Sequence, residues 1–274
     1  EIRYVLLQAM GKAFVRPVGA SAVSQALEAS QEPIALQVVR EGTTAPEATA
    51  GRVYHLAQFG HNGQPFLRDE TDREHYFHAF CQAALGRGLV LHGWCLLESE
   101  AHWLVCPQRN DALSAVLQQT GRRYVRHFNG RWALRGSPWE GRYRSYWLDA
   151  QSYGLQLLSW LEWRPVRLGL SPKVFAWPWT MASLVLGHRQ QSSATPFRPM
   201  EAYWQLGNTP FEREARFSEL LDDPPNETPD PLQHLRSARP MLSEQFWARL
   251  PDAERRLWTC RPRGRPPKEV SVPN

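Results

Sequence analysis

Residues 94–105 read Trp-Cys-Leu-Leu-Glu-Ser-Glu-Ala-His-Trp-Leu-Val, and this stretch decides the expected fold. An apolar run covers residues 89–97, a polar break follows at Glu98 and Ser99, and a second apolar run begins at residue 101. Two short apolar runs with a break between them predict two consecutive β-strands. Since side chains two residues apart on a strand share a face, Glu100 and His102 are expected side by side.

Glu100 and His102 would present one carboxylate and one imidazole to the same space. That pair suits two ligands of a hard or borderline cation such as Mg²⁺ or Mn²⁺. The alternative is a solvated strand face that needs no cofactor. Both interpretations stay open on the spacing alone.

The composition favours a globular chain with an acidic partner. The chain has 274 residues, of which 42% are hydrophobic, enough for one large domain or one domain with extensions. Its formal net charge is +5, which favours nucleic acid first. Arginine supplies nearly all of the positive charge and suits bidentate phosphate and guanine contacts, although a GC-rich genome would give the same bias.

The cysteine spacing and the hydropathy argue against a zinc ribbon and against a membrane protein. Cys81, Cys95, Cys106 and Cys260 form no CxxC pair, so a zinc ribbon is not expected. No apolar stretch reaches the ~18 residues of a membrane span, and no signal peptide is visible. We therefore expect a cytoplasmic protein with no membrane partner.

The elements around the opening stretch alternate in a recognisable order. Apolar periodicity and turn signals predict strands at 53–59, 89–97, 101–106 and 139–148, and helices at 69–85, 112–128 and 150–163. The first six elements, β-α-β-β-α-β, match the split βαβ arrangement. The predicted fold class is α+β, a ferredoxin-like split βαβ antiparallel sheet with helices on one face. The third helix is expected near the sheet.

Several short motifs occur in a particular order between about residues 52 and 186. They are Tyr54-His55-Leu56, Phe66-Leu67-Arg68-Asp69 with Asp72, Arg123-Tyr124-Val125-Arg126-His127-Phe128-Asn129, Trp139-Glu140-Gly141-Arg142-Tyr143-Arg144-Ser145, Ser152-Tyr153 after Asp149, and Pro165-Val166-Arg167-Leu168-Gly169-Leu170. In this order the sequence resembles the single-tyrosine HUH transposases. It is most similar in pattern to the REP-associated tyrosine transposases, which act on DNA hairpins of repetitive extragenic palindromes. The region 203–210 and the tail 261–268 extend the resemblance.

The sequence pattern and the resemblance together predict a domain organisation. Residues 1–50 are an N-terminal appendage and linker, with a helix expected around 20–29, and residues 51–186 are the transposase-like HUH domain. Residues 187–258 form a helical C-terminal extension, and residues 259–274 a basic tail like an AT-hook. An extended Arg-Gly-Arg-Pro segment holding Arg263 and Arg265 can lie in an A·T minor groove. A basic tail that binds any polyanion is the alternative.

The resemblance also implies a catalytic constellation. In the family a His-hydrophobic-His pair holds a divalent cation that polarises the scissile phosphate. A tyrosine on the third helix attacks and forms a 5′-phosphotyrosine link, and a polar residue four positions later completes the metal shell. The pair maps to Glu100 and His102, the nucleophile position to Trp160 and its polar partner to Arg164.

These positions depart from the family's pattern. Tryptophan has no nucleophilic oxygen, and a permanently charged arginine repels a cation instead of ligating it. We therefore expect the cleavage chemistry to be lost. Tyr153 is an alternative nucleophile, because it shares the face of Trp160, but it would lie ~10 Å along the helix axis. Packing is its other expected role.

DNA binding could persist without cleavage. Arg122, Arg123 and Arg126, with Arg142 and Arg144, are expected to contact phosphates along a groove beside the sheet. Arg164 could neutralise a phosphate where the cation would sit. The aromatic side chains expected either to stack on unpaired bases or to join the core are Trp132, Trp139, Tyr143 and Tyr146.

The leading hypothesis is a catalytically silent protein that binds hairpin or single-stranded DNA. The enzyme alternative is an active metal-dependent transposase or single-strand endonuclease that forms a phosphotyrosine intermediate. A third is a decaying gene product with neither function. The sequence leaves monomer and homodimer open.

Overall fold

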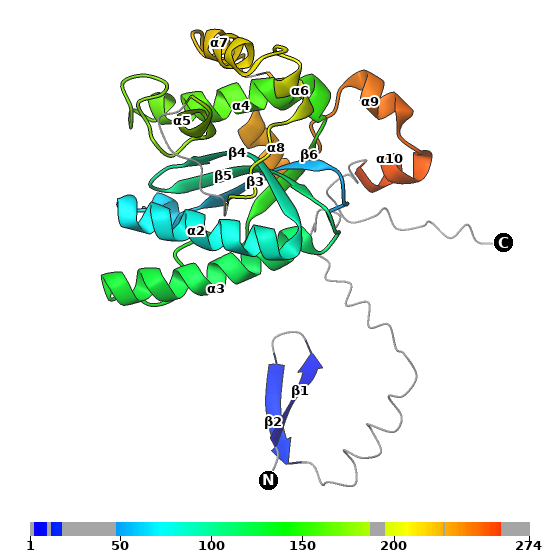
Figure 1. The fold of residues 1–274 in the computed structure, drawn as a ribbon. Helices are drawn as coiled ribbons and strands as arrows, with labels where there is room; N and C mark the ends of the chain where they lie inside the picture. The colour runs from blue at the N-terminus through cyan, green and yellow to red at the C-terminus, as the bar shows by residue number, and fades with distance from the viewer. Residues whose placement is uncertain (1–2, 10–11, 18–47, 187–194, 227, 259–274) are drawn as a thin grey trace, which may run out of the picture. The chain divides into compact units, whose positions relative to one another are not determined.

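The computed structural model describes residues 3–9, 12–17, 48–186, 195–226 and 228–258, which belong to two compact units, 1–44 and 45–274 (Figure 1). In the first unit the described part is an antiparallel hairpin of β1 (Arg3–Ala9) and β2 (Lys12–Pro17). The helix expected around residues 20–29 and the tail with Arg263 and Arg265 lie outside the described residues.

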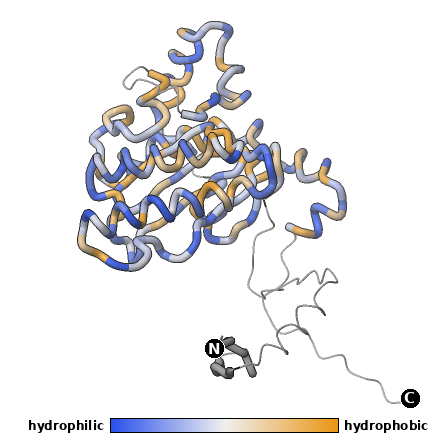
Figure 2. Tube along the Cα trace, turned by 60° about the horizontal axis from the view of Figure 1, so that its bottom comes forward, coloured by the Kyte–Doolittle hydropathy of each residue, from blue (hydrophilic) through white to orange (hydrophobic). Residues whose placement is uncertain are grey.

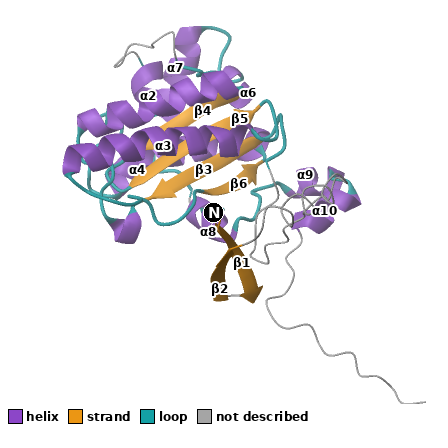
Figure 3. Ribbon diagram, turned by 90° about the horizontal axis from the view of Figure 1, so that it is seen from below, coloured by secondary structure: helices purple, strands orange, loops and turns teal. Residues whose placement is uncertain are grey.

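The second unit is built on a four-stranded antiparallel sheet. Its strands are β3 (Val53–Phe59), β4 (Leu89–Leu96), β5 (Glu100–Pro107) and β6 (Arg144–Leu148). They lie in the order β4-β5-β3-β6 (Figure 3). This order, with one helix between β3 and β4 and another between β5 and β6, confirms the predicted α+β, ferredoxin-like split βαβ fold.

Helices cover both faces of the sheet. Helices α2 (Glu70–Arg87) and α3 (Ala112–Trp132) lie together on one face, and α4 (Ala150–Arg167) lies across the other (Figure 1). Successive side chains of β5 point to opposite faces of the sheet. Trp103 stacks on Phe80 of α2 with ring centroids 3.7 Å apart, while His102 faces α4. Hydrophobic and hydrophilic residues alternate along these helices, as Figure 2 shows.

A glycine sets how closely α4 approaches the sheet. A Cβ placed on Gly93 of β4 would lie 2.6 Å from Cδ2 of Leu158, well inside contact distance. A side chain here would displace Leu158, whereas glycine lets α4 seat this leucine directly on the strand.

A side-chain cap marks the start of α2 but not of α3, and α4 continues past a proline. The side chain of Asp69 accepts from the Asp72 N–H and caps the start of α2. Asp111 makes no such bond, because its carboxylate pairs with Arg109. Helix α4 does not stop before Pro165 but continues to Arg167. Proline removes only its own N–H, and the last turn closes through the Leu168 N–H to the Arg164 carbonyl.

The strand predicted at 139–148 is shorter in the structure. Trp139 makes an isolated bridge to Gly60, and the regular strand β6 begins only at Arg144. Gly141, with φ of 69°, has a left-handed backbone that interrupts extended structure. Arg142 therefore lies in a loop and does not share a strand face with Arg144.

After α4 the described chain forms short helices joined by loops. The helices are α5 (Met181–Val185), α6 (Glu201–Trp204), α7 (Pro210–Leu220), α8 (Pro231–Ser237), α9 (Glu244–Arg249) and α10 (Asp252–Trp258). Helix α8 contacts β6 and β3, and Met241 after it pairs with Leu148. Among the described residues no helix has both the length and the apolarity to cross a membrane.

Candidate functional site

Glu100 and His102 lie side by side on the α4 face of β5, and two groups from neighbouring strands join them. His102 Nε2 is 3.1 Å from Glu100 Oε2, and His102 Nδ1 is 3.1 Å from His55 Nε2. His55 Nδ1 is in turn 3.0 Å from the Tyr146 hydroxyl oxygen. The antiparallel pairing of β3 with both β5 and β6 brings these side chains together.

The ionised carboxylate of Glu100 determines which ring nitrogen of each histidine carries a proton. Ionised Glu100 can only accept, so His102 Nε2 carries the proton and donates. His102 Nδ1 then accepts from His55 Nε2, and His55 Nδ1 accepts from the Tyr146 hydroxyl. Both rings are neutral in this arrangement. Burial lowers the pKa of His102, with Glu100 partly opposing the shift, and burial with the nearby His102 lowers the pKa of His55 further.

Arg164 of α4 closes the chain at Glu100. Its Nε donates to Oε2 at 2.9 Å and its Nη2 to Oε1 at 2.8 Å, a bidentate ion pair. Burial alone would raise the pKa of Glu100, but hydrogen bonds from His102 and Arg164 outweigh it and lower the pKa to about 2. The carboxylate is therefore ionised and neutralised within the protein.

Trp160 covers the two imidazoles. It lies one turn before Arg164 on α4, and its ring centroid is 5.9 Å from that of His55 and 5.4 Å from that of His102, both edge to face. The Arg164 guanidinium carbon lies 5.3 Å from the same ring, a cation–π contact. The indole is 3% exposed, so an aromatic wall stands at the nucleophile position expected from the family resemblance.

These groups, as arranged, do not fit a divalent cation. Both oxygens of Glu100 accept from Arg164, and both nitrogens of His102 are used in hydrogen bonds. A cation at this place would also lie beside the permanent charge of Arg164. Among the described residues, no group of three or more His, Cys, Asp or Glu side chains could hold a metal ion.

Tyr153 lies near the start of α4, half-buried against the core. Seven residues separate it from Trp160, which places it ~10 Å along the helix axis. The hydrogen-bond chain that runs from Tyr146 through His55, His102 and Glu100 to Arg164 does not include it.

The candidate DNA-binding arginines occupy two different parts of the surface. Arg122, Arg123 and Arg126 are exposed on α3, and Arg123 donates to Gln82 of α2 at 2.6 Å. Arg144 is on β6, facing the side that α4 covers, and pairs with Glu140 at 3.4 Å. The structure therefore does not line these arginines along one groove beside the sheet, because α3 lies on the opposite face.

The four aromatic residues expected either to stack on bases or to join the core lie in different environments. Trp139 and Tyr146 are buried in the core, and Tyr146 is committed to His55. Trp132 is half-buried, donates from Nε1 to Asp72 and lies under Arg68. Tyr143 is half-buried beside the start of β6.

His55 and Tyr146 belong to the buried hydrogen-bond chain. The sequence did not predict this role for either residue. His55 stood in a matched motif and Tyr146 among the stacking candidates. A histidine inside the apolar strand 53–59 was the available signal, since a buried histidine needs partners. Which partners it finds depends on strand register, which the sequence does not display.

No protein-family model matches the sequence, and no curated protein matches it. The fold is similar to a solved structure described as "Structure of the REP associates tyrosine transposase bound to a REP hairpin". The similarity covers 56% of this chain and 96% of that chain at 14% sequence identity, with a TM-score of 0.43. A likeness this distant does not establish a shared family or activity.

Proposed function

We propose that this protein binds hairpin or single-stranded DNA without cutting it. The observation that carries the proposal is the distribution of charge along α3 and the loop to β6. Residues 112–148 hold seven arginines and one glutamate, an excess of six positive charges, while the whole chain carries +5. A basic segment of this kind attracts a phosphate backbone.

Four of these arginines are free to meet phosphates. Arg131 is tied to Asp69 and Asp72, Arg144 pairs with Glu140, and Arg123 bonds Gln82. The remaining ones are exposed and make no ion pair with a carboxylate of the described residues; they are Arg122, Arg126, Arg135 and Arg142. We name the two of them on α3, Arg122 and Arg126, the α3 arginine surface. Arg122 and Arg126 are one helical turn apart, so they can contact neighbouring phosphates of one strand.

The lack of cleavage is the second part of the proposal. Trp160 offers no nucleophilic oxygen, and the ion pair of Glu100 with Arg164 uses the groups that a cation would need. Because Glu100 cancels the charge of Arg164, this guanidinium also adds little attraction for phosphate. The sequence motifs that resemble REP-associated transposases support hairpin or single-stranded DNA as the form of nucleic acid bound.

A gel-shift and a denaturing gel run in parallel test both parts. A labelled DNA hairpin with a single-stranded arm is incubated with the protein in Mn²⁺ and in chelator, beside a blunt duplex of equal length. We expect a shift of the hairpin in both conditions, and uncut DNA in the denaturing lanes. A Mn²⁺-dependent product or a covalent protein–DNA adduct would support the transposase alternative instead. Absence of any shift at moderate salt would contradict DNA binding.

A further inference from the structure

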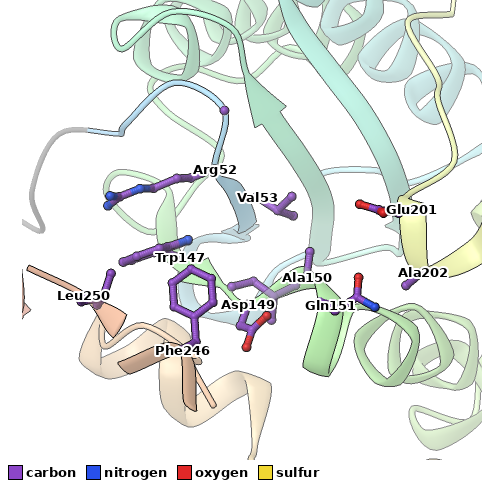
Figure 4. Close-up of a pocket in the computed structure, with 12 residues that line it drawn as sticks. Arg52, Val53, Trp147, Asp149, Ala150, Gln151, Glu201, Ala202, Phe246 and Leu250 are labelled. Carbon is purple, nitrogen blue, oxygen red and sulfur yellow. The ribbon is translucent and has the colours of Figure 1, made fainter. Parts of the chain in front are cut away.

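A cavity of about 290 Å³ opens at the end of the sheet away from the Glu100–Arg164 pair. Val53, at one end of β3, lies on it, whereas Phe59, at the other end, pairs with Glu100. Six residues of extended strand separate the two places by ~20 Å. The cavity is therefore separate from that ion pair; Figure 4 shows the residues that line it.

One wall of the cavity is aromatic and held in place. Arg52 lies 3.9 Å over the Trp147 ring, and its Nη2 donates to Glu254 of α10 at 2.6 Å. Phe246 of α9 packs edge to face on Trp147 with centroids 5.3 Å apart. Trp147 is buried, but Phe246 is half-buried and lines the opening, so it presents an aromatic surface to whatever enters.

The facing side combines an apolar floor with an uncommitted carboxylate. In Figure 4 the side chains of Val53 and Ala150 converge on the same space as the carboxylate of Glu201. Glu201 makes no side-chain hydrogen bond or ion pair with another described residue. By contrast, Asp149 below it is already satisfied by Ser243 and Ser152. The cavity thus offers the carboxylate of Glu201 as an acceptor opposite an aromatic wall.

We propose that this cavity binds a flat heteroaromatic ring with an exocyclic amino group, the chemistry of an unpaired cytosine, adenine or guanine base. The ring would lie against Phe246 and the apolar floor, and its amino group would donate to Glu201. A cavity of this volume has room for one such ring. The guanidinium of Arg52 is already paired with Glu254, so a basic group that pairs with Glu201 is the competing ligand, and the experiment below includes one.

The proposal rests on the proposed function only for the source of the base. A base extruded from a bound single strand and a free nucleoside carry the same ring and amino group. Experiments with nucleosides alone and with DNA strands separate these two sources, and the nucleoside arm does not need the α3 arginine surface.

The nucleoside arm compares deoxycytidine with deoxyuridine, which differ at the amino or carbonyl group on C4 and in the protonation of the adjacent N3. Ligand-observed NMR with the full chain should show binding of deoxycytidine and at least about fivefold weaker binding of deoxyuridine. Glu201→Gln should remove this preference. Glu244→Gln, an exposed substitution on α9 that does not line the cavity, should keep it.

The strand arm measures the affinity of a hairpin with one unpaired dC against the same hairpin with dU. A Glu201-dependent preference for dC identifies a base of the strand as the ligand, and preference among nucleosides alone identifies a free nucleoside. Equal binding of deoxycytidine and deoxyuridine, or equal behaviour of Glu201→Gln and Glu244→Gln, would overturn the proposal. So would tighter binding of an arginine amide than of deoxycytidine. If deoxycytidine binds but no hairpin does, the proposed function fails while the cavity keeps its ligand.

Discussion

Arg164 and Glu100 form a bidentate ion pair between α4 and β5, although 64 residues separate them in the sequence. Their side chains are 13% and 14% exposed, so most of the pair is shielded from water. Because little water reaches the pair, each charge depends on its partner for neutralisation.

Removing one partner should therefore cost more than removing both. Arg164→Met leaves the Glu100 carboxylate shielded and without its counter-charge, with neutral His102 as its remaining donor, and we expect it to lower the free energy of unfolding by about 3 kcal/mol. Adding Glu100→Gln to Arg164→Met should recover part of this loss, since a neutral amide needs no counter-charge. Urea titrations of the single and double variants measure both effects.

The exposed pair of Arg109 with Asp111 supplies the control. Its side chains are 66% and 50% exposed, so Arg109→Met should change the stability by less than about 0.5 kcal/mol. Equal losses for Arg109→Met and Arg164→Met would contradict a structural role for the Glu100–Arg164 pair.

The same pair should decide whether Mn²⁺ binds. In the wild type we expect no change in the melting temperature at millimolar Mn²⁺, because Glu100 and His102 are already committed to hydrogen bonds within the protein. Arg164→Gln removes the competing charge and releases the carboxylate. This variant should melt at a higher temperature with Mn²⁺ than with chelator. A Mn²⁺-dependent rise in the wild type would show instead that the ion pair opens readily.

The sequence predicted the sheet well because each strand carries its own signal. The apolar runs at 89–97 and 101–106 and the alternation at 53–59 are local, and strands formed there. The predicted strand from residue 139 was too long, since the aromatic residues before Arg144 resemble a strand while Gly141 turns the backbone. The helix predicted at 150–163 was too short, because α4 continues past Pro165 to Arg167.

The site was predictable only in part, for a physical reason. Glu100 and His102 could be placed on one face by their spacing within one strand. Their contact with His55, and the pairing of Glu100 with Arg164, depend on strand register and on which face α4 covers. Those relations join residues far apart in the chain, and no local pattern encodes them.

A buried carboxyl on α4 should give the stability an unusual pH dependence. Burial raises the pKa of Glu162 from 4.5 to about 7, although polar interactions with Thr180 and with the backbone N–H groups of Ala182 and Met181 oppose the shift. Between these two values the folded protein binds a proton that the unfolded chain has released. This group therefore favours folding at acid pH, and its contribution falls as the pH rises from 4.5 to 7.

Glu162→Gln isolates this effect from the other titrating groups. The lowered pKa values of His55 and His102 act the other way, since the unfolded histidines take up protons below about 6.5. The difference in unfolding free energy between variant and wild type should move in favour of the variant by up to about 3 kcal/mol from pH 5 to pH 8. A difference independent of pH would mean that Glu162 is ionised throughout.

The α3 arginine surface should control the salt dependence of DNA binding. Removing one arginine that neutralises a phosphate should reduce the slope of log affinity against log salt by about 0.7 to 0.9. Arg122→Ala with Arg126→Ala should thus lower the slope by about 1.5, with a uniform decrease of affinity across hairpin sequences. Fluorescence anisotropy of a labelled hairpin over a range of salt measures this slope.

Arg216→Ala, at an exposed arginine on α7, is the matched control for the double variant. It removes one positive charge from a part of the surface far along the chain from α3, so it should leave the slope unchanged. An unchanged slope in the double variant would place the DNA on another face of the molecule. A slope that falls in the double variant alone would instead assign the phosphate contacts to Arg122 and Arg126.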